Sequence, residues 1–580
     1  MRQTRSKRVR QEEKMWLPEL PPFMPFMIIA LFVFFSRGPL VTVLMLAAPL
    51  WGALNLWQLE QGLLWQVTLV DLQLMPLRVD KLSTFFGYLF HLASFFCIVY
   101  ALHVRDKVQQ LACLLYTAAA LGAVFSGDLL SLFIFWEMMA LSSVFLIWAR
   151  RSADSYASGL RYLAYQVISG LLLLLGTLFY WQEHGSLAFT YMSLQGTGAW
   201  LIFFAFGIKC AFPMLHTWLT DGYPNATASG TVFLSAFTTK VAVYGLARGF
   251  PGSEILIYIG AVMTCFPIFY AVIENDLRQV LAYSLINQLG FMVVGIGIGT
   301  ELALNGAVAH AFNDVLFKGL LFMSMGAVLQ MTGRINGSEL GGLYKTMPKT
   351  TLLCLVGAAS ISAFPLFNGF VSKSMVMTAA LNQGHEWIWL ALLFASAGVF
   401  HHAGIKIPYF AFFAHDSGIR SQDPPNNMLL AMVIAATLCL AIGIYPNLLY
   451  QLLPFTSAYQ PYDVSHVLAQ TQLLCFAALA FLWLNLKGLY PPELPSVNLD
   501  VDWFYRRLLA NVWSKLSNII WQTDQHIRQV FLAKLKQLLA LVAKYHRPSG
   551  ILARAQTVGN MALWIAILLA CSLGLSFIGL

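Results

Sequence analysis

Sixteen apolar stretches, each about as long as a helix that crosses a bilayer, set the main constraint on how this chain can fold. They begin near Phe23 and Pro39 and recur around 83–104, 108–126, 129–149, 162–181, 197–213, 225–247, 254–273, 279–299, 303–331, 350–381, 387–413, 428–450, 467–486 and 559–580. Of the 580 residues, 58% are hydrophobic and 11% charged, and the mean hydropathy is +0.68. This composition excludes a soluble protein with a solvated surface, and we predict an all-α polytopic membrane protein with about 16 transmembrane helices.

The net charge of +9 informs topology and gives no reason to expect nucleic acid, because positively charged loops stay in the cytoplasm. Loops after segments four, six, ten, twelve and fourteen carry no Lys or Arg, whereas loops after odd-numbered segments carry Arg37, Arg105, Lys107, Arg150, Arg151, Arg278, Arg334, Lys345, Lys349 and Arg420. The alternation favours extracytoplasmic termini, although the first fourteen residues are basic. We follow the loops and expect a multi-pass protein of the cell inner membrane.

Cofactor and metal motifs are missing from the sequence. The eight cysteines stand singly in apolar segments, without a CxxC pair or a Cys/His cluster, which argues against a metal, an Fe–S cluster or a disulfide framework. "GIGIG" at 295–299 lies inside an apolar segment with no preceding strand, so it is not a dinucleotide-binding loop. We expect no cofactor, and the first apolar segment has no cleavage pattern of a signal peptide, so we interpret it as a membrane span.

A motif that occurs twice in the sequence predicts an internal repeat. "AFPMLHTW" begins at Ala211 and "AFPLFNGF" at Ala363, and each places a proline, Pro213 or Pro365, inside a long apolar segment. Proline removes a backbone donor and breaks or kinks a helix. Paired interrupted segments indicate an inverted-repeat transporter in which freed backbone groups line a hydrated cavity. Two unrelated proline kinks are the alternative.

The repeat and the apolar pattern together divide the chain. We expect N-terminal helices (1–107), a first inverted repeat of segments four to eight (108–250), a second of segments nine to thirteen (251–415), accessory helices (416–490), a lateral segment (491–556) and an anchor helix (557–580). From Asp502 to His546 apolar residues recur at three- and four-residue spacing among seven Lys and Arg residues. This pattern predicts a long amphipathic helix on the cytoplasmic membrane surface.

Ionisable residues at bilayer depth are candidate functional groups, because they cost several kcal/mol unless paired or hydrated. Burial and a neighbouring charge shift the pKa of such groups, so a water-connected chain of them can relay protons. A buried Lys–Glu pair that only ties helices together is the alternative for any single residue. The predicted proton relay consists of Glu137, Lys209, Lys240, His310, Asp314, Lys318, Lys373 and Lys406.

Two arrangements within this set carry specific predictions. Glu137 lies in the middle of the fifth segment, and we expect it to act as a switchable counter-ion of Lys209. His310, Asp314 and Lys318 are spaced four and four, which places them on one face of a helix.

At these residues the chain resembles the antiporter-like subunits of respiratory complex I, membrane-bound hydrogenases and Mrp-type sodium/proton antiporters. The matching stretches include "SGDLLSLFIFWEMMALSS" with Glu137, "GIKCAFPMLHTWLTDGYPNATASGTVFLSAFTTKVAVYGLAR" with Lys209 and Lys240, "ENDLRQVLAYSLINQLGFM", "AHAFNDVLFKGLLF" with Lys318, and "MPKTTLLCLVGAASISAFPLFNGFVSK" with Lys373. The resemblance runs from about Asp80 to Lys406. It implies discontinuous seventh and twelfth spans and proton translocation along a hydrated axis at mid-membrane.

The resemblance leaves the type of subunit open. The sequences "SGDLL" and "TKVAVYGLAR" are most similar to the D-type Mrp subunit, whereas the amphipathic segment and final span resemble the distal complex I subunit. Asp314 stands where that distal subunit often has histidine, and Asn313 where the D-type subunit often has one.

The expected function is proton translocation within a multisubunit membrane complex with other membrane subunits as partners. We expect it to exchange protons for a monovalent cation, sodium. The alternatives are a proton-pumping subunit of a complex I-like NADH dehydrogenase or hydrogenase, in which partners carry the electrons, and an energy-coupling subunit of an inorganic-carbon uptake complex. A membrane scaffold without transport is disfavoured by the cost of so many buried charges.

Overall fold

The computed structural model describes residues 20–578 apart from 70–71, 492, 496–497 and 552–556. The basic N-terminal tail, which bears on the predicted topology, lies outside these residues. The chain divides into two compact units, Met1–Asn498 and Leu499–Leu580. The unit boundary falls inside the predicted lateral segment 491–556, because Asn498 still donates to the Glu274 carboxylate of the first unit at 2.9 Å.

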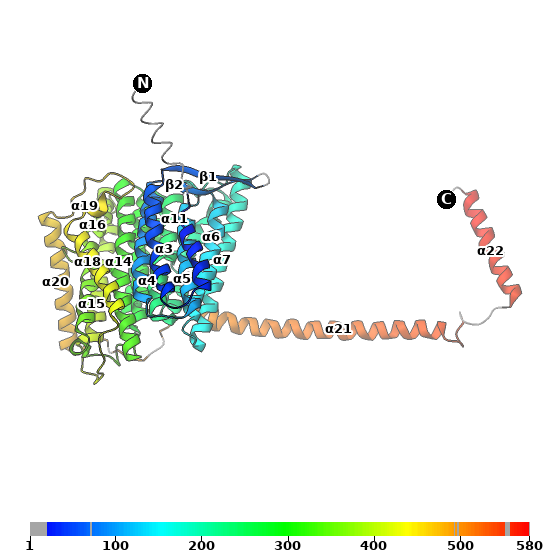
Figure 1. The fold of residues 1–580 in the computed structure, drawn as a ribbon. Helices are drawn as coiled ribbons and strands as arrows, with labels where there is room; N and C mark the ends of the chain where they lie inside the picture. The colour runs from blue at the N-terminus through cyan, green and yellow to red at the C-terminus, as the bar shows by residue number, and fades with distance from the viewer. Residues whose placement is uncertain (1–19, 70–71, 492, 496–497, 552–556, 579–580) are drawn as a thin grey trace, which may run out of the picture. The chain divides into compact units, whose positions relative to one another are not determined.

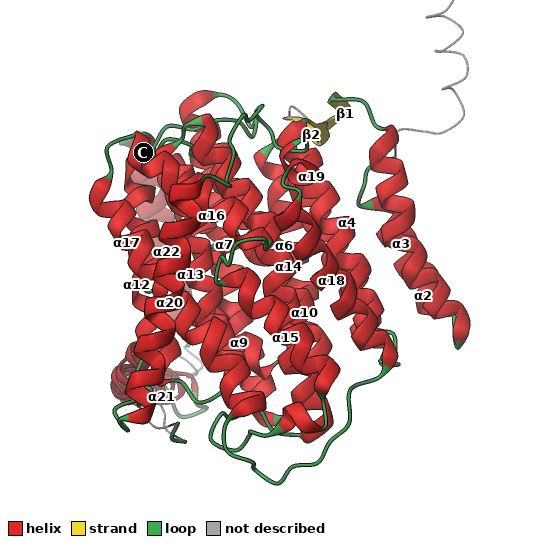
Figure 2. Cartoon of the chain, turned by 90° about the vertical axis from the view of Figure 1, so that its left-hand side faces the viewer, coloured by secondary structure: helices red, strands yellow, loops and turns green. Residues whose placement is uncertain are grey.

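Helices make up the first unit almost entirely (Figures 1 and 2). In the part of the whole chain that the structure describes, thirteen helices are long and apolar enough to cross a bilayer, and three further apolar helices are shorter. Together they coincide with the sixteen predicted segments, so the all-helical polytopic fold is confirmed. Outside the repeats, the helices of the first unit are α2 (Met24–Phe35), α3 (Pro39–Gln58), α4 (Lys81–Ala101), α18 (Asn426–Ile444), α19 (Asn447–Tyr450) and α20 (Val464–Leu486).

Two groups of helices form the repeats. The first group comprises α5 (Lys107–Phe125), α6 (Leu129–Trp148), α7 (Ala153–His184), α8 (Gly196–Lys209), α9 (Thr217–Asn225), α10 (Ala228–Ala236) and α11 (Thr238–Gly249). The second comprises α12 (Glu254–Ile273), α13 (Leu277–Ile298), α14 (Glu301–Thr332), the short 3₁₀ helix η1 (Leu343–Lys345), α15 (Pro348–Ile361), α16 (Asn368–Asn382), α17 (Glu386–Val399) and the π-helical turns η2 (Phe400–Lys406) and η3 (Tyr409–Phe413).

Backbone pairing shows that the two groups are copies of one unit. An isolated antiparallel bridge joins Asp128 to Ala188, and a second joins Asp276 to Asn336, so both positions recur after 148 residues (128 to 276, 188 to 336). The long helices α7 and α14 both contain 32 residues, and each ends at a glycine in the left-handed conformation. The same local hydrogen bonds therefore fold both repeats.

The second copy is inverted with respect to the first. Asp128 begins α6, and Arg150, two residues beyond its last residue, donates to Pro224 O at 2.7 Å. Arg278, in the first turn of α13, donates to the same carbonyl at 3.0 Å. The start of α13 therefore lies at the end of the bundle where α6 finishes, and the predicted inverted repeats are confirmed.

Both predicted discontinuities are present. Pro213 lies between α8 and α9, and Pro365 lies between α15 and α16. The two breaks share one hydrogen-bond pattern, because Phe212 N donates to Gly207 O at 2.9 Å and Phe364 N donates to Ala359 O at 3.1 Å. Each break also requires left-handed backbone at two residues that are not glycine, which costs free energy and is common near functional sites; these residues are Ala211, Met214, Ala363 and Leu366.

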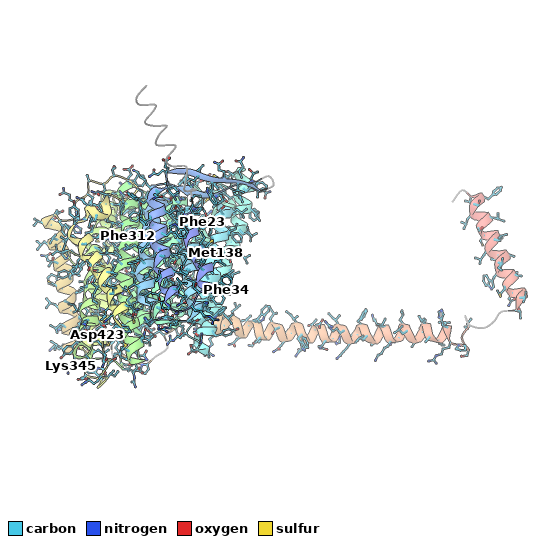
Figure 3. All side chains as sticks on the ribbon, viewed as in Figure 1. Phe23, Phe34, Met138, Phe312, Lys345 and Asp423 are labelled. Carbon is cyan, nitrogen blue, oxygen red and sulfur yellow. The ribbon has the colours of Figure 1, made fainter. Side chains whose placement is uncertain are left out.

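The loops that carry the basic residues gather at one end of the bundle. Figure 3 labels Lys345 and Asp423 there, at the end opposite the hairpin. The loops contact one another: Lys107 Nζ donates to Phe34 O at 2.6 Å, and Arg151 pairs with Asp106 at 3.0 Å. We call this end of the first unit the basic end. That it faces the cytoplasm remains a prediction.

A β-hairpin, which we did not predict, covers the opposite end of the first unit (Figure 1). Strands β1 (Gly62–Leu69) and β2 (Leu72–Val79) pair antiparallel, and Gly127 N, just before α6, donates to Met75 O at 2.7 Å. The second strand, "LQLMPLRV", alternates apolar and polar residues at 72–74 and at 77–79, a pattern typical of strands. The hairpin was not predicted because strong helical patterns precede and follow this segment.

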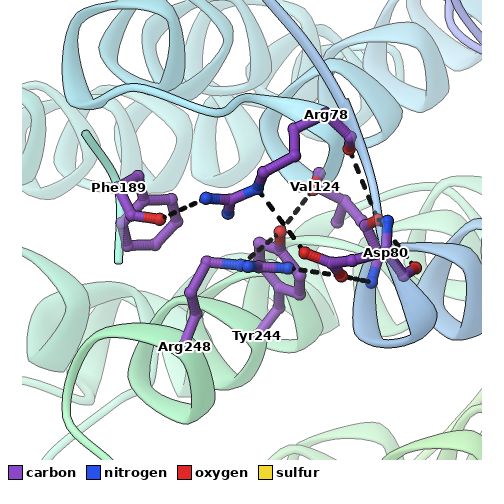
Figure 4. A network of polar contacts seen from close by, with 7 residues as sticks. Arg78, Asp80, Val124, Phe189, Tyr244 and Arg248 are labelled. Carbon is purple, nitrogen blue, oxygen red and sulfur yellow. Dashed lines mark hydrogen bonds and ion pairs between the residues drawn. The ribbon is translucent and has the colours of Figure 1, made fainter. Parts of the chain in front are cut away.

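A polar network fixes the hairpin to the bundle (Figure 4). Asp80 caps α4 and pairs with Arg248 of α11 at 2.8 Å, while Arg248 Nε donates to the hydroxyl of Tyr244 at 2.7 Å. Arg78 of β2 donates to Phe189 O at 2.7 Å. Burial raises the pKa of Asp80, but the hydrogen bond and charge of Arg248, with smaller contributions from Ser83 N–H and Arg78, outweigh it and hold this pKa below the usual value.

The second unit contains the π-helical turn η4 (Phe504–Leu509), α21 (Ala510–His546) and α22 (Val558–Phe577). At 1.5 Å per residue, the 37 residues of α21 extend over about 55 Å. Ion pairs one turn apart, such as Arg528 with Asp524 at 2.7 Å, support the helix, while Trp513, Ile520 and Leu538 are exposed within this unit. The predicted long amphipathic helix and the terminal apolar helix are therefore both present.

Replacement of Asp80 by asparagine tests the hairpin network. Asparagine can still cap α4, but it leaves the Arg248 guanidinium without its carboxylate. We expect the free energy of unfolding to fall by about 2 kcal/mol, measured by denaturant or thermal unfolding in detergent. Asp154→Asn, in the exposed first turn of α7, is the control and should change stability much less; equal effects of the two substitutions would contradict the assigned role of the ion pair.

Candidate functional site

The ionisable residues predicted from the sequence lie inside the helical bundle. Lys373 is 2% exposed, Glu137 is half-buried, and the side chains of Lys209, Lys240, His310, Asp314, Lys318 and Lys406 are fully buried. Such burial requires each charge to have a partner, a hydrogen-bond acceptor or water. Their contacts therefore define the chemistry of the site.

Lys209 is held by the helix that carries Glu137, not by the Glu137 carboxylate. Asp128 caps α6 by accepting from Ser131 N at 2.7 Å, which fixes the start of this helix. At the end of α8, Lys209 Nζ donates to Trp136 O at 2.8 Å and lies 4.3 Å from the centre of the Trp136 ring. Glu137 and Lys209 are within electrostatic range but form no ion pair in the described part of the chain.

The Glu137 carboxylate lies over a glycine of α7. A Cβ atom placed on Gly170 would lie 1.4 Å from Glu137 Oε1, so only glycine leaves room for this rotamer. Glu137 Oε1 is buried and accepts no hydrogen bond from the described residues. In this structure the Glu137 carboxylate is thus not paired with Lys209; that the two form a switch stays a prediction.

Lys240 forms the tightest ion pair of the site. Its Nζ atom lies 2.5 Å from Asp314 Oδ2 of α14, and both side chains are fully buried. Lys240 Nζ also donates to Ser235 O at 3.1 Å, a carbonyl freed where the span is interrupted between α10 and α11. The interrupted span therefore supplies both the lysine and one of its acceptors.

Lys318 lies one turn further along α14 and contacts a different helix. Its Nζ atom donates to Ser284 Oγ of α13 at 2.7 Å. The repeat places Lys318 at the position of Gly170, because 148 residues separate them and both helices have 32 residues. Gly170 and Lys318 are therefore equivalent positions of the two repeats. In the first repeat the Glu137 carboxylate lies over this position, and in the second the position itself carries an ammonium group.

His310 belongs to an amide and hydroxyl network. Its Nε2 atom lies 3.1 Å from Gln288 Oε1, and its Nδ1 atom lies 3.0 Å from Ser372 Oγ. Since an amide oxygen only accepts, we assign the proton of the neutral ring to Nε2. Asn313 Nδ2 also donates to Ser372 Oγ at 3.0 Å. The predicted face of α14 with His310, Asp314 and Lys318 contacts three neighbouring helices, α11, α13 and α16.

Lys373 and Lys406 occupy the far part of the second repeat. Lys373 Nζ donates to Ile361 O at 2.8 Å, where α15 ends at the Pro365 break, and lies 5.2 Å from the centre of the Phe291 ring. Lys406 Nζ lies 2.9 Å from Glu493 Oε1 and donates to two carbonyls at the end of α12. Sequence interpretation missed Glu493, because it stands in the polar linker "YPPELPS", which has no transmembrane signal.

Electrostatic contacts connect these groups into one row. Lys318 is within range of Asp314, Lys240 and Lys373. Cys210, next to Lys209, is within range of Lys240, which brings the first repeat to the same row. At the other end, His402 is within range of both Lys318 and Lys406. We call the set from Glu137 to Lys406 the charged row.

Buried polar atoms without a protein partner mark where water fits. A buried polar group that lacks a partner costs free energy, and buried water commonly supplies the missing hydrogen bond. Within the described residues, such atoms on the helices of the charged row and on α7 and α17 belong to Glu137, Gln166, Thr239, Asp314, Asn368, Ser396 and His402. Gln166, with both amide atoms unpartnered, occupies the position on α7 that Asp314 occupies on α14.

No group of three or more His, Cys, Asp and Glu side chains that could hold a metal ion occurs within the described residues. All eight cysteines are free. The carboxylate, imidazole and amine groups of the charged row can bind protons and transfer them. The polar residues that the sequence analysis did not select, Ser284, Gln288 and Ser372, carry no distinguishing signal, because such residues are common in membrane helices.

Several known proteins are similar in sequence to this chain. Residues 126–400 match the family described as NADH:quinone oxidoreductase/Mrp antiporter, transmembrane region. Hydrogenase-4 component B of Escherichia coli is 28% identical over 424 residues, which cover 64% of this chain and 62% of that protein. The D-type subunit of the Na(+)/H(+) antiporter of Alkalihalophilus pseudofirmus is 26% identical over 473 residues, covering 74% and 94%.

Two solved structures share the fold. The Mrp complex from Dietzia sp. contains a chain with a TM-score of 0.64 at 21% identity, covering 77% of this chain and 95% of that one. The archaeal membrane-bound sulfane sulfur reductase contains a chain with a TM-score of 0.66 at 21% identity, covering 78% and 97%. The predicted resemblance to the antiporter-like superfamily is confirmed, and both structures are multisubunit membrane complexes.

Removal of the Asp314 charge tests the central ion pair. In Asp314→Asn the buried Lys240 ammonium loses its carboxylate, so we expect the free energy of unfolding to fall by about 3–5 kcal/mol in detergent. The double variant Lys240→Gln/Asp314→Asn removes both charges and should recover most of this loss. An Asp314→Asn protein as stable as the wild type would show that no charge pair exists there.

The space above Gly170 can be closed without any change of charge. In Gly170→Ala the new methyl group must displace the Glu137 carboxylate, so we expect proton flux in membrane vesicles to fall about tenfold or more. Gly319→Ala is the matched control on α14, since its Cβ would meet the nearest atom, of Phe96, at 3.4 Å, and flux should be retained. Unchanged flux in Gly170→Ala would contradict a role for the carboxylate position.

Proposed function

From the membership of residues 126–400 in the NADH:quinone oxidoreductase/Mrp antiporter transmembrane family, we propose that this antiporter-like subunit translocates protons along the charged row. The observation that carries the proposal is the row itself: buried or half-buried ionisable groups from α6 to η2, several of them beside helix breaks, in electrostatic range of their neighbours. Charges at bilayer depth are costly, and a chain that only spans the membrane has no need of them.

The proposed path begins in the first repeat. Protons enter near α8 to α11 from one side of the membrane and bind Lys209, Lys240 and intervening water. Glu137 stabilises the charged form of Lys209 when its carboxylate approaches, and it favours release when it lies over Gly170 as it does here. Unpartnered polar atoms of Gln166 on α7 and Thr239 on α11 offer sites for water in the first repeat.

Asp314 is suited to pass the charge between the repeats. It pairs with Lys240 at 2.5 Å and is within electrostatic range of Lys318 and Lys373. When Lys318 takes up a proton, its ammonium competes with Lys240 for this carboxylate, and Lys240 can then release its own proton. The hydrogen bond between His310 and Ser372 lies one helical turn from Asp314 on α14. Exit follows by Lys373 or Lys406.

Exchange of protons for sodium is the favoured form of this transport. The D-type subunit of the Alkalihalophilus antiporter aligns over 94% of its length, and the Dietzia structure is named as an Mrp complex. By this proposal the chain works in the cell inner membrane, within a complex of other membrane subunits. Protons and sodium are its substrates, and no cofactor of its own is required.

A second candidate is a proton-pumping subunit of a redox-driven complex. The hydrogenase component and the sulfane sulfur reductase support it, and so does the unit with α21 and α22, which resembles the extension of the distal complex I subunit. Energy coupling to inorganic-carbon uptake is a third. Co-purification with Fe–S or flavin subunits would favour the redox complex, whereas sodium-dependent proton flux without them would favour the antiporter.

Neutralisation of Glu137 tests the proposed function. In Glu137→Gln the switchable charge is lost at nearly constant volume, so we expect cation-dependent proton flux in vesicles to fall to the level of vesicles that lack the complex. The amount of protein in the membrane should not change. Glu254→Gln, at the exposed start of α12, is the control and should retain flux. Full flux in Glu137→Gln would refute its role.

A further inference from the structure

The linker after α20 inserts a carboxylate into the basic end of the bundle. The side chain of Glu493 is 5% exposed and lies 2.9 Å from Lys406 Nζ. On either side of it, Tyr490 packs against the ring of His401 at 5.5 Å, and Asn498 donates to Glu274 Oε2 at 2.9 Å. Both Lys406 and Glu493 lie beyond residue 400, where the family match ends.

Lys406 Nζ has three oxygen neighbours. It donates to Val272 O at 2.6 Å and to Glu274 O at 2.7 Å, and it forms an ion pair with Glu493 Oε1 at 2.9 Å. A neutral amine keeps two N–H donors and gains one lone pair. Lys406 can therefore lose the third proton and still serve both carbonyls, while its lone pair accepts a hydrogen bond from a protonated Glu493.

We propose that Glu493 is the terminal proton-transfer residue of the charged row, receiving protons from Lys406 and releasing them at the basic end. The inference rests on the proposed function and extends the row beyond its last lysine.

The transfer step balances without a further reactant. The N–H bond of the Lys406 ammonium breaks and an O–H bond forms on Glu493 Oε1, which converts a buried ion pair into a buried neutral pair. The carboxylic acid then gives its proton to water at the basic end and becomes a carboxylate again. Lys406 is reprotonated from Lys318 through His402 and water, and the cycle restores the ion pair.

His402 provides the link toward the centre of the membrane. It is fully buried, and neither ring nitrogen has a hydrogen-bond partner among the described residues. It lies within electrostatic range of Lys318 on one side and Lys406 on the other. It stands on the π-helical turn η2, an irregularity that is frequent at functional sites.

The second oxygen of Glu493 is buried near a loop of the basic end and has no hydrogen-bond partner among the described residues. A Cβ atom placed on Gly337, in the loop that follows α14, would lie 3.5 Å from Glu493 Oε2. Burial raises the pKa of Glu493, and the charge of Lys406 only partly opposes this, with the Glu274 carboxylate adding to the rise. The carboxyl group is thereby able to hold a proton before it passes it on.

The alternative is that Glu493 only holds the linker against the bundle. Variants without the Glu493 charge distinguish this structural role from proton transfer. In Glu493→Gln within the intact complex, the amide keeps the shape and an acceptor but cannot take a proton. We expect proton flux in membrane vesicles to fall about tenfold or more with normal assembly. Glu493→Asp should restore a large part of the flux, and Asn498→Ala, which loosens the linker without removing the carboxylate, should retain it.

The double variant Lys406→Gln/Glu493→Gln covers the case in which Glu493→Gln fails to assemble. It replaces the ion pair with neutral amides, so assembly should be restored while flux remains low. Restored flux in this variant, or full flux in Glu493→Gln while Glu137→Gln abolishes it, would overturn the terminal role and leave the proposed function standing. Full flux in both Glu137→Gln and Glu493→Gln would refute the proposed function as well.

Discussion

The cost of holding a charge away from water is the constraint on which the rest of this structure depends. The buried lysines meet it in several ways: Lys209 uses a backbone carbonyl and an indole face, Lys240 a carboxylate, and Lys318 a hydroxyl. Several of the acceptors are carbonyls at helix breaks or helix ends. The discontinuities therefore do more than bend helices, because they supply the oxygen atoms that make the buried charges tolerable.

The inverted repeat explains how such a row can run between two sides of the membrane. Inversion gives the two copies of each break opposite orientations, so equivalent helices approach from both surfaces. The copies have diverged in charge while keeping their backbone: Gly170 stands where the second repeat has Lys318, and Gln166 where it has Asp314. One scaffold thus presents a carboxylate near one end and a Lys–Asp pair near the centre.

The sequence predicts the fold well and the contacts poorly. Apolar length and the two Ala-Phe-Pro motifs predict the spans and both breaks, because hydrogen bonding in lipid leaves the backbone few choices. The β-hairpin at 62–79 was missed, since it lies between strong helical signals. The partners were missed as well: neither the distance of Glu137 from Lys209 nor the approach of Glu493 to Lys406 follows from spacing, because each depends on packing between segments far apart in the chain.

The central claim is that water joins the charged row into a continuous path, and placing that water tests it most directly. A structure of the complex in lipid, at a resolution that shows ordered water, should reveal water bonded to Gln166, Thr239, Asp314 and His402 and connecting Lys209 to Lys406. Dry apolar packing around these atoms, with each lysine confined to a separate pocket, would contradict the account.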